Sequence, residues 1–207
     1  MKTATLLLTS TALVLGLNST AFADNDKDHK NKASFAAELS GGQEVLTTKI
    51  LDSNSKEVTI PIGPLVTGAY GEAHFSLSKD GTMLNYHFEA AGFGTPLFMA
   101  HIHLGPKGAN GPIMVWLFGD QTNAPDEFTL LRGDDGPFTG SMSGVLTEAD
   151  LDMLSAEDRA KLASLGVNTF ADVITNIMNG NAYVNLHTTA NIPGEIRGQV
   201  KSEGHHH

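Results

Sequence analysis

The sequence predicts an all-β fold, an antiparallel Greek-key β-sandwich or flattened barrel with a short helical insertion. Apolar and polar residues alternate over many short segments, which is the period of a half-buried strand. Turns rich in glycine and proline separate these segments at short intervals, as in sandwiches and barrels rather than in parallel sheets. The chain contains no cysteine, so we expect packing alone to hold the core of this single domain.

The first 23 residues have the three-part organisation of a secretory signal peptide. Lys2 forms a short basic start, residues 6–17 form an apolar run, and Ala21-Phe22-Ala23 is a small-residue cleavage site. The apolar run is too short to span a bilayer, and no later stretch approaches the roughly 20 apolar residues of a membrane helix. We therefore expect a secreted or periplasmic protein with no membrane span after cleavage.

Both ends of the mature chain are expected to lie outside the folded domain. Residues 24–33 are charged and lack apolar periodicity, which predicts a disordered leader. Residues 202–207 form a histidine-containing tail, and His205, His206 and His207 would bind metal as a flexible tract whether they are native or a tag remnant. The domain itself is predicted to span residues 34–201.

Period-two alternation over residues 72–78, and again over residues 83–90, predicts two half-buried strands. Asp80-Gly81 between them is the preferred pair of a two-residue type I′ hairpin turn. If these two residues form the turn, the residue numbers of any two facing residues on the strands add up to the same value. This rule places His74 directly opposite His87. Further strands are predicted at residues 34–39, 57–62, 97–104, 112–118, 137–143, 182–188 and 195–201.

Residues 146–180 break the alternation and predict a helical insertion between two strands. Thr147 is a typical N-cap, and Asp150 three residues later completes an imperfect capping box. A second short helix is predicted from Thr169 to Met178, with Gly180 as its stop.

Histidines on two of the predicted strands form the most informative pattern in the chain. His101 and His103 are two residues apart, so both project from the polar side of strand 97–104, and His187 projects from the polar side of strand 182–188. Imidazoles that share a strand face lie roughly 6–7 Å apart and can converge on one metal ion. We therefore predict that a surface histidine cluster of His101, His103 and His187 binds a transition metal.

Copper is the expected metal and zinc the alternative, because ligation by nitrogen without sulfur suits both and copper stands highest in the divalent affinity order. His74 and His87 are further candidates, since facing residues in a ladder are close enough to share an ion. Iron would need a carboxylate partner, for which Glu38, Glu44 and Glu195 are available. The alternative for all of these histidines is a solvated or hydrogen-bonded side chain that holds loops in place.

Charge and motif content exclude several other classes of function. The formal charge of −10 and the isoelectric point near 5.2 argue against a nucleic-acid partner, which needs a basic patch. No serine hydrolase elbow, phosphate-binding glycine loop or helical His-Glu-x-x-His motif is present in the sequence. The lack of cysteine also removes thiolate metal sites and cysteine nucleophiles.

A set of motifs that runs in order from about residue 34 to residue 201 resembles one known family. The motifs are Leu39-Ser40-Gly41-Gly42-Gln43-Glu44-Val45, Asp80-Gly81-Thr82, Ala100-His101-Ile102-His103-Leu104-Gly105, Gly108 through Pro112, Gly144-Val145-Leu146-Thr147, Tyr183-Val184-Asn185-Leu186-His187-Thr188 and Gly194-Glu195-Ile196-Arg197-Gly198-Gln199. Together they resemble the chordin-type CHRD domain. Such domains occur as repeats in the extracellular antagonist chordin and as single-domain exported proteins of microbes.

The resemblance implies an all-β fold with a His-x-His strand similar to that of copper–zinc superoxide dismutase. On that similarity, His101 and His103 match the two copper ligands of the His-x-His strand, and His187 matches a third ligand from a later strand. The chain differs from the dismutase in lacking an evident zinc-binding loop with a bridging histidine, which argues against a two-metal enzyme. It differs from the family at Leu46-Thr47, where two prolines commonly stand.

Three functions follow as expectations, and the first is preferred. The protein binds copper or zinc for storage, transport or buffering; or it is a copper-dependent oxidoreductase of the dismutase type, with Arg197 as a guiding cation. The third possibility is an extracellular or periplasmic protein-binding or structural module. Its exposed aromatic patch would consist of Phe93, Phe98, Trp116 and Phe118.

Overall fold

The computed structural model describes residues 33–119 and 138–203. The predicted signal peptide, residues 24–32 of the predicted leader and the last four residues of the chain lie outside the described residues. The strands are β1 (Ser34–Ser40), β2 (Leu46–Leu51), β3 (Glu57–Gly63), β4 (Tyr70–Leu77), β5 (Leu84–Phe93), β6 (Leu97–Leu104), β7 (Ile113–Phe118), β8 (Phe138–Leu146), β9 (Ala182–Thr188), β10 (Ile196–Gln199) and β11 (Lys201–Ser202). The helices are the 3₁₀ turns η1 (Gly41–Gln43) and η2 (Glu148–Met153) and the α-helices α1 (Ala156–Ser164) and α2 (Phe170–Met178).

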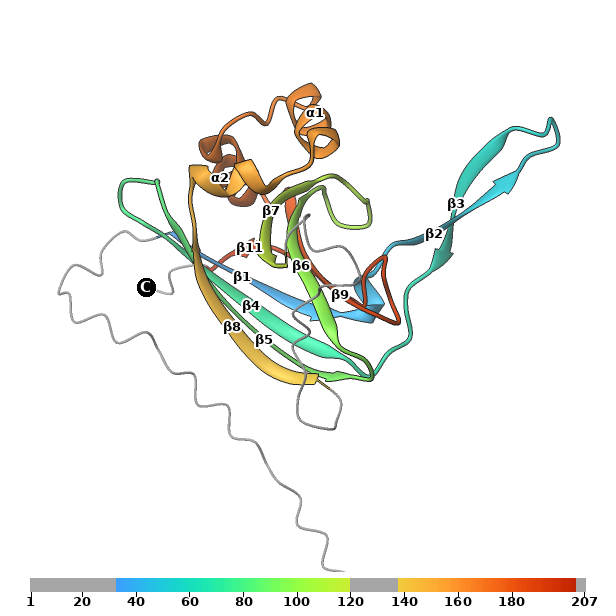
Figure 1. Ribbon diagram of the computed structural model, residues 1–207, viewed down its shortest axis with the longest axis horizontal. Coiled ribbons are helices and arrows are strands. Elements are labelled where there is room, and N and C mark those ends of the chain that lie inside the picture. The colour runs from blue at the N-terminus through green and yellow to red at the C-terminus, as the bar shows by residue number, and fades with distance from the viewer. Residues whose placement is uncertain (1–32, 120–137, 204–207) are drawn as a thin grey trace, which may run out of the picture. The chain divides into compact units, whose positions relative to one another are not determined.

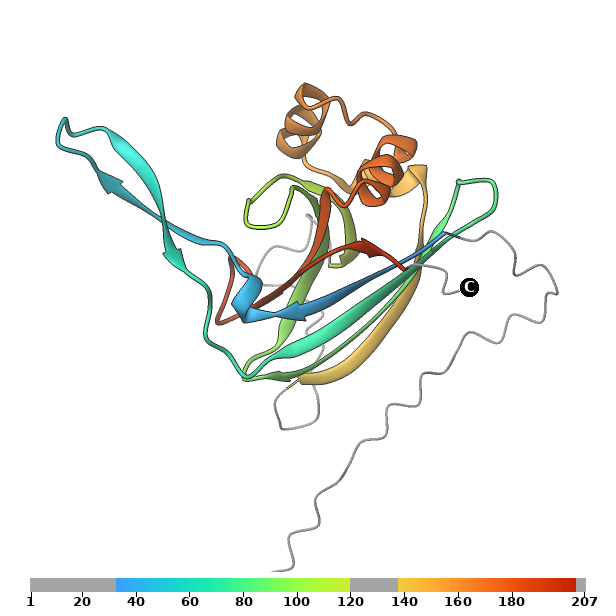
Figure 2. The same cartoon turned by 180° about the vertical axis from the view of Figure 1, so that it is seen from behind.

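Nine of the described strands form one continuous sheet, in which the strand pairs are antiparallel. The strand order is β7-β6-β9-β10-β1-β4-β5-β8, and β11 pairs with β1. The sheet curls strongly (Figures 1 and 2). Because of this curl, the Tyr86 hydroxyl on β5 donates a 2.6 Å hydrogen bond to the Leu117 carbonyl on β7, the strand at the opposite edge of the sheet. The all-β prediction is confirmed in its barrel form: the sheet is a nearly closed barrel rather than two separate facing sheets.

Period two also predicts correctly which strand faces are inside. Phe75 on β4, Phe88 on β5, Ile102 on β6 and Val184 on β9 are buried in one core cluster. Side chains alternate across a strand, so the polar residues of β6 and β9 lie on the opposite face. This alternation positions the histidines of these two strands.

The β4–β5 hairpin has the predicted register but a different turn. His74 pairs with His87, as the constant sum of residue numbers requires. The predicted two-residue type I′ turn is wrong, because that turn needs a positive φ at both central residues and only Gly81 has one, at 75°. The Asp80 carboxylate instead accepts hydrogen bonds from the backbone and the hydroxyl of Thr82, which stabilise a longer loop.

The helical insertion lies over one end of the barrel (Figure 1). Thr147 and Asp150 form the predicted capping box, but the helix that they start is only the short η2. Ser155 then caps a new helix, α1, by accepting a hydrogen bond from the Asp158 backbone. α2 follows the prediction, with Thr169 as its N-cap. Within the described residues, none of the helices is long and apolar enough to cross a membrane.

Two further features differ from the expectation. β2 and β3 form a separate two-stranded ribbon that projects from the barrel (Figures 1 and 2), and only the β3 strand was predicted. The folded region also continues past residue 201, because Ser202 pairs with Phe35 and the Glu203 backbone donates a hydrogen bond to Ser34. The histidine-containing tail, predicted to begin at residue 202, therefore begins inside the sheet.

Candidate metal centre

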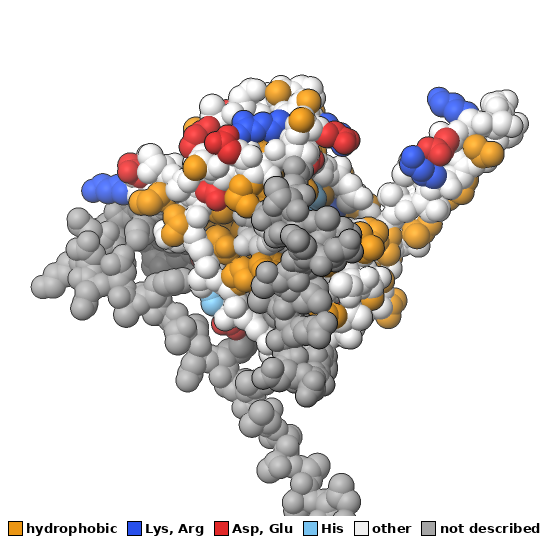
Figure 3. Space-filling view, viewed as in Figure 1, with side chains coloured by type: hydrophobic (Ala, Val, Ile, Leu, Met, Phe, Trp, Pro, Cys, Tyr) orange, Lys and Arg blue, Asp and Glu red, His pale blue; other side chains and the backbone are white. Residues whose placement is uncertain are grey.

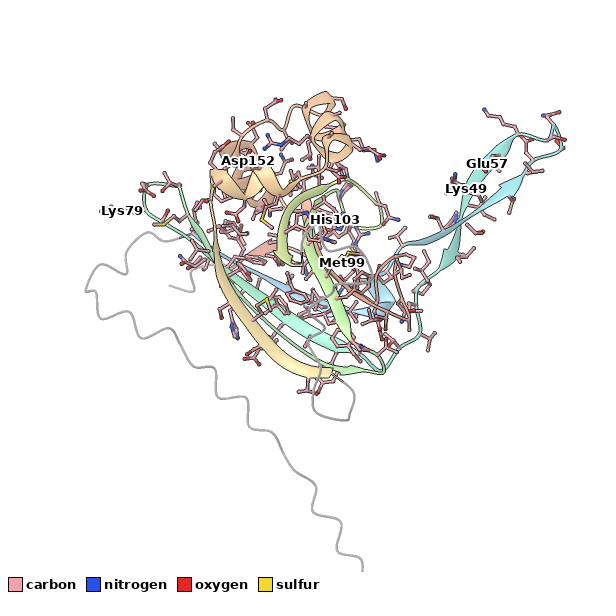
Figure 4. The ribbon with its side chains drawn as sticks, in the orientation of Figure 1. Lys49, Glu57, Lys79, Met99, His103 and Asp152 are labelled. Atoms are coloured by element: carbon pink, nitrogen blue, oxygen red, sulfur yellow. The ribbon has the colours of Figure 1, made fainter. Side chains whose placement is uncertain are left out.

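Two neighbouring strands carry the three histidines of the predicted cluster. His101 and His103 lie on β6, and His187 lies on β9, which pairs with β6 in antiparallel register. In this ladder His101 faces Asn185 and Met99 faces His187, so His187 lies diagonally across from His101. Figure 4 shows His103 and Met99 along β6. The alternation of each strand brings all three imidazoles to the same face of the sheet.

The three imidazoles lie close together. Each residue offers one ring nitrogen, and these three nitrogens lie within 4.8 Å of one another. His101 Nδ1 lies 3.2 Å from His187 Nε2. The ring centroid of His101 lies 5.4 Å from that of His103 and 4.9 Å from that of His187. The structure thus brings together residues that are 86 positions apart in the chain.

The cluster is buried, which corrects the expectation of a surface cluster. His101 is 1 % exposed and His187 is 5 % exposed, whereas His103 is partly exposed. Trp116 of the neighbouring β7 packs edge-on against His101, with the ring centroids 4.1 Å apart. Phe98 lies edge-on to His187 at 6.5 Å. Aromatic side chains from outside the motif therefore cover the polar side of these strands.

Backbone carbonyls orient two of the three rings. His103 Nδ1 lies 3.0 Å from the Gly111 carbonyl oxygen, and His187 Nδ1 lies 2.8 Å from the Ile192 carbonyl oxygen. A carbonyl only accepts hydrogen bonds, so both Nδ1 atoms carry the proton. The Nε2 lone pair of His103 is then free, whereas that of His187 accepts the hydrogen bond from His101 Nδ1. The buried Nε2 atoms of His101 and His103 find no hydrogen-bond partner among the described residues.

Burial keeps the three imidazoles neutral. It lowers the pKa of His103 to about 4 and that of His187 to about 4. The pKa of His101 lies well below its usual value, first because of burial and then because of the neighbouring His187 and His103. Metal ions bind the neutral imidazole, so at pH 7 no proton has to be removed from these rings before an ion binds.

The ring of Tyr183 stacks on the ring of His103 and helps to hold it in place. The two rings are stacked, with centroids 4.9 Å apart and planes 5° apart. The Tyr183 hydroxyl accepts a 3.1 Å hydrogen bond from the Gly111 backbone, and the Gly111 carbonyl in turn accepts from His103. Gly111 therefore fixes both rings of the stack.

Arg197 completes this support and does not act as the expected guiding cation. Its guanidinium carbon lies 3.3 Å from the Tyr183 ring centroid, and the side chain is 2 % exposed. It donates hydrogen bonds to Asn110 Oδ1 and to the carbonyl oxygens of Ala109 and Pro106. A cation buried under a loop holds that loop in place and offers no charge to an approaching substrate.

His74 and His87 lie apart from the buried cluster, on β4 and β5. They face each other in the ladder as predicted, but they are not part of the group of three whose nitrogens converge. His74 lies near the Glu72 and Glu203 carboxylates, and His87 contacts Glu89. Within the described part of the chain, His74 is therefore an exposed side chain beside two carboxylates, and His87 is a half-buried side chain that is hydrogen-bonded to Ser143 and Glu89.

The three candidate carboxylates lie outside the histidine group, and two of them are buried. Glu38 is exposed. Glu195 accepts hydrogen bonds from Thr67, Asn191 and Thr188. Asn191 directly precedes Ile192, whose carbonyl oxygen orients His187. By accepting a hydrogen bond from Asn191, Glu195 therefore stabilises the loop that carries this carbonyl. Iron ligation through these carboxylates is therefore not supported.

The profile of the CHRD domain matches residues 35–200. The chain belongs to the CHRD family. The match runs from β1 through β10 and includes both strands that carry the histidine cluster. CHRD is an extracellular-type domain. No curated protein matches the chain.

The four aromatic residues expected to form an exposed patch for protein binding do not lie exposed on the surface of this CHRD domain. Phe93, Phe98 and Trp116 are buried, and Phe118 is partly buried. Aromatic residues in strands more often belong to a core, and Trp116 here covers His101.

Sequence analysis missed three residues that shape the site of this CHRD domain. Tyr183 shares a strand face with His187, so period two could have indicated it. Gly111 lies within one of the family motifs, but its hydrogen bonds are made by the backbone. Ile192 contributes only its carbonyl oxygen, for which the sequence holds no signal.

Glu44 provides a test of the electrostatics of this region. Burial raises the pKa of Glu44 to about 7, with the attraction of Arg197 opposing the shift. A carboxyl whose pKa is raised by folding stabilises the fold below its unfolded pKa of 4.5, and this contribution is lost as the pH rises through about 7. Between pH 5 and pH 8 we expect a loss of about 2–3 kcal/mol in the free energy of unfolding from this group.

Glu44→Gln should match the wild type at pH 5 and exceed it in stability at pH 8, because glutamine resembles the protonated acid. Urea unfolding of both proteins at several pH values measures the difference. Other titrating groups are present in both proteins and cancel in this comparison. Parallel curves for the two proteins would show that Glu44 is ionised in the folded state at pH 5.

Proposed function

We propose that this CHRD domain binds one transition-metal ion through His101, His103 and His187, for storage, transport or buffering of the ion. The observation that carries the proposal is the buried group of three neutral imidazoles with one nitrogen each within 4.8 Å. Buried polar atoms normally have partners, so the unpartnered Nε2 atom of His103 favours a role in ligation.

Binding one ion requires the imidazoles to move closer together. Around a tetrahedral ion, ligand atoms at 2.0–2.1 Å from the metal lie about 3.3–3.4 Å apart. His101 Nδ1 and His187 Nε2 are already 3.2 Å apart, and an ion held by these two atoms would replace the hydrogen bond between them. Nitrogens at the 4.8 Å bound must approach each other by about 1.4 Å through side-chain rotations. Three protein ligands leave a further coordination position for a water molecule or an exogenous ligand.

Copper is the proposed ion and zinc the alternative. The group consists of imidazole nitrogens alone, the chain has no cysteine, and the nearby carboxylates lie outside the group. Nitrogen ligation suits both metals, and copper binds more tightly in the divalent series. The predicted signal peptide, together with the extracellular type of the domain, supports a secreted or periplasmic location.

Metal titration of the protein without residues 204–207 tests the proposal, because His205–His207 bind metal on their own. Native mass spectrometry should show one copper ion per chain, and the variant with alanine at residues 101, 103 and 187 should show none. His74→Ala is the matched control, and it should keep full stoichiometry. One tightly bound ion in the triple variant would contradict the proposal.

A further inference from the structure

Met99 lies on the same face of the sheet as the three histidines. In the ladder between β6 and β9 it pairs directly with His187, and the irregularity of this ladder lies before it, between Leu97 and Met99. Facing residues of an antiparallel ladder project to the same side, with Cβ atoms about 5 Å apart. Met99 (Figure 4) also precedes His101 by two residues on β6, and the period of the strand gives the same side. Met99 therefore projects to the side that carries the cluster.

The side chain of Met99 is suited to reach an ion held by these rings. It is partly buried and packs against the buried hydrophobic cluster, to which Trp116 also belongs. Trp116 covers His101, and the Nε2 atom of His187, the residue opposite Met99, lies 3.2 Å from His101 Nδ1. Methionine is unbranched and has three rotatable bonds, so its sulfur adapts to irregular positions. Rotation of this side chain can therefore bring the sulfur to the ion.

A sulfur ligand in this protein can come only from methionine, because the chain contains no cysteine. Three histidines leave one position of a four-coordinate ion free. Among the described residues, Met99 is the methionine that faces a histidine of the cluster across a pair of strands. Its thioether is therefore the sulfur that can fill this position.

The ligand atoms are uncharged and lie away from water. Imidazole nitrogens and a thioether carry no negative charge, and the free-energy cost of burying an ion rises with the square of its charge. Most acidic side chains of the described residues lie at the surface, as over the helical insertion in Figure 3, and the buried Glu44 and Glu195 lie outside the histidine group. A buried, uncharged set of ligands therefore favours a monovalent ion over a divalent one.

A positive charge beside the cluster acts in the same direction. The guanidinium carbon of Arg197 lies 3.3 Å from the ring centroid of Tyr183, and this ring stacks on that of His103. Arg197 is 2 % exposed, so water screens its charge poorly. Glu44 has a pKa of about 7 and therefore offsets this charge only in part at neutral pH. The repulsion between Arg197 and an ion at the cluster is about twice as large for a divalent ion as for a monovalent one.

We infer that Met99 supplies a thioether ligand and that the ion held by His101, His103 and His187 is copper(I). The inference rests on the metal binding proposed above and specifies its ion. Soft thioether ligands select copper(I), whereas imidazole alone suits zinc and copper(II) as well. The aromatic side chains that cover the cluster keep water from the ion and lower the dielectric constant around it. The ion binds and leaves as copper(I), so no redox step is required.

Competition with bicinchoninate under anaerobic, reducing conditions measures the copper(I) affinity of the protein without residues 204–207. The wild type should hold one copper(I) ion per chain. Met99→Leu should lower this affinity at least about tenfold, because a lost ligand costs at least as much as a lost orienting group, and should leave the copper(II) affinity unchanged. Met142→Leu is the matched control, because Met142 is also partly buried against the hydrophobic cluster but faces Phe88. Leucine nearly conserves the volume of methionine, so both variants should fold.

X-ray absorption of the copper(I)-loaded proteins gives a second readout. The wild type and Met142→Leu should show a sulfur atom bound to copper, and Met99→Leu should show nitrogen alone. Equal copper(I) affinities of Met99→Leu and the control, or a wild-type spectrum without sulfur, would overturn the inference. If the wild type still held one copper ion that the triple alanine variant at residues 101, 103 and 187 had lost, the proposed metal binding would stand. A wild type that binds copper in neither oxidation state would contradict both.

Discussion

Replacing His187 by alanine is expected to lower the copper affinity at least about 100-fold. Changes to groups that only orient a ligand cost 10–100-fold in affinity, so the loss of a ligand costs at least as much. At a metal concentration of 100 times the wild-type dissociation constant, binding stabilises the wild type by about 2.7 kcal/mol and the variant by only about 0.4 kcal/mol. Thermal unfolding with and without copper measures both values.

His87→Ala is the control for this experiment, because His87 lies on β5, outside the buried group. It should keep the full stabilisation by copper. The comparison is made between the metal-free and metal-loaded forms of each protein, so any loss of stability in the metal-free variant cancels. Equal stabilisation of His187→Ala and the wild type would remove His187 from the ligand set.

Gly111→Ala is expected to destabilise the protein by about 3 kcal/mol and to weaken metal binding 10–100-fold. A Cβ atom at this position would overlap the backbone of Leu104, which cannot move like the end of a flexible side chain. Overpacking of this kind costs about 1–3 kcal/mol, and each lost hydrogen bond adds about 1 kcal/mol. The displaced backbone would also release the hydrogen bonds that hold His103 and Tyr183.

Urea unfolding measures the first effect, and copper titration of the folded variant measures the second. Gly94→Ala is the matched control, because its added Cβ would meet no atom within 4 Å and its φ is not positive. We expect this control to change the free energy of unfolding by less than about 0.5 kcal/mol. If Gly111→Ala behaved like the control, the loop would not orient His103.

The barrel strands were predictable because their signal is local. Alternation identified the inward faces, and the constant sum of residue numbers placed His74 opposite His87 even though the turn type was wrong. The error at the turn has a simple cause: Asp-Gly also suits a longer loop in which the carboxylate of Asp80 caps backbone groups. The turn type depends on φ at Asp80, whereas the register depends only on the sum of residue numbers.

β2 was not predicted because its side chains are largely exposed on both faces. Apolar and polar residues alternate clearly where one face of a strand is buried in a core. In the ribbon neither face is buried in the core, so this pattern is weak. That Ile50, Val58 and Ile60 lie on the same side of the ribbon became visible only when the pairing of β2 with β3 was known, because the register assigns them to one face.

At the histidine cluster, the sequence determined by itself which side chains share a strand face, because that depends only on the two-residue period of a single strand. His101 and His103, and separately the side of His187, followed from this rule. The tertiary structure alone decided the rest. It brings the three rings together, buries them beneath Trp116 and Phe98, and orients two of them by backbone carbonyls. The physical reason is that the pairing of β6 with β9 and the packing of distant loops join segments far apart in the chain, and no local pattern encodes these contacts.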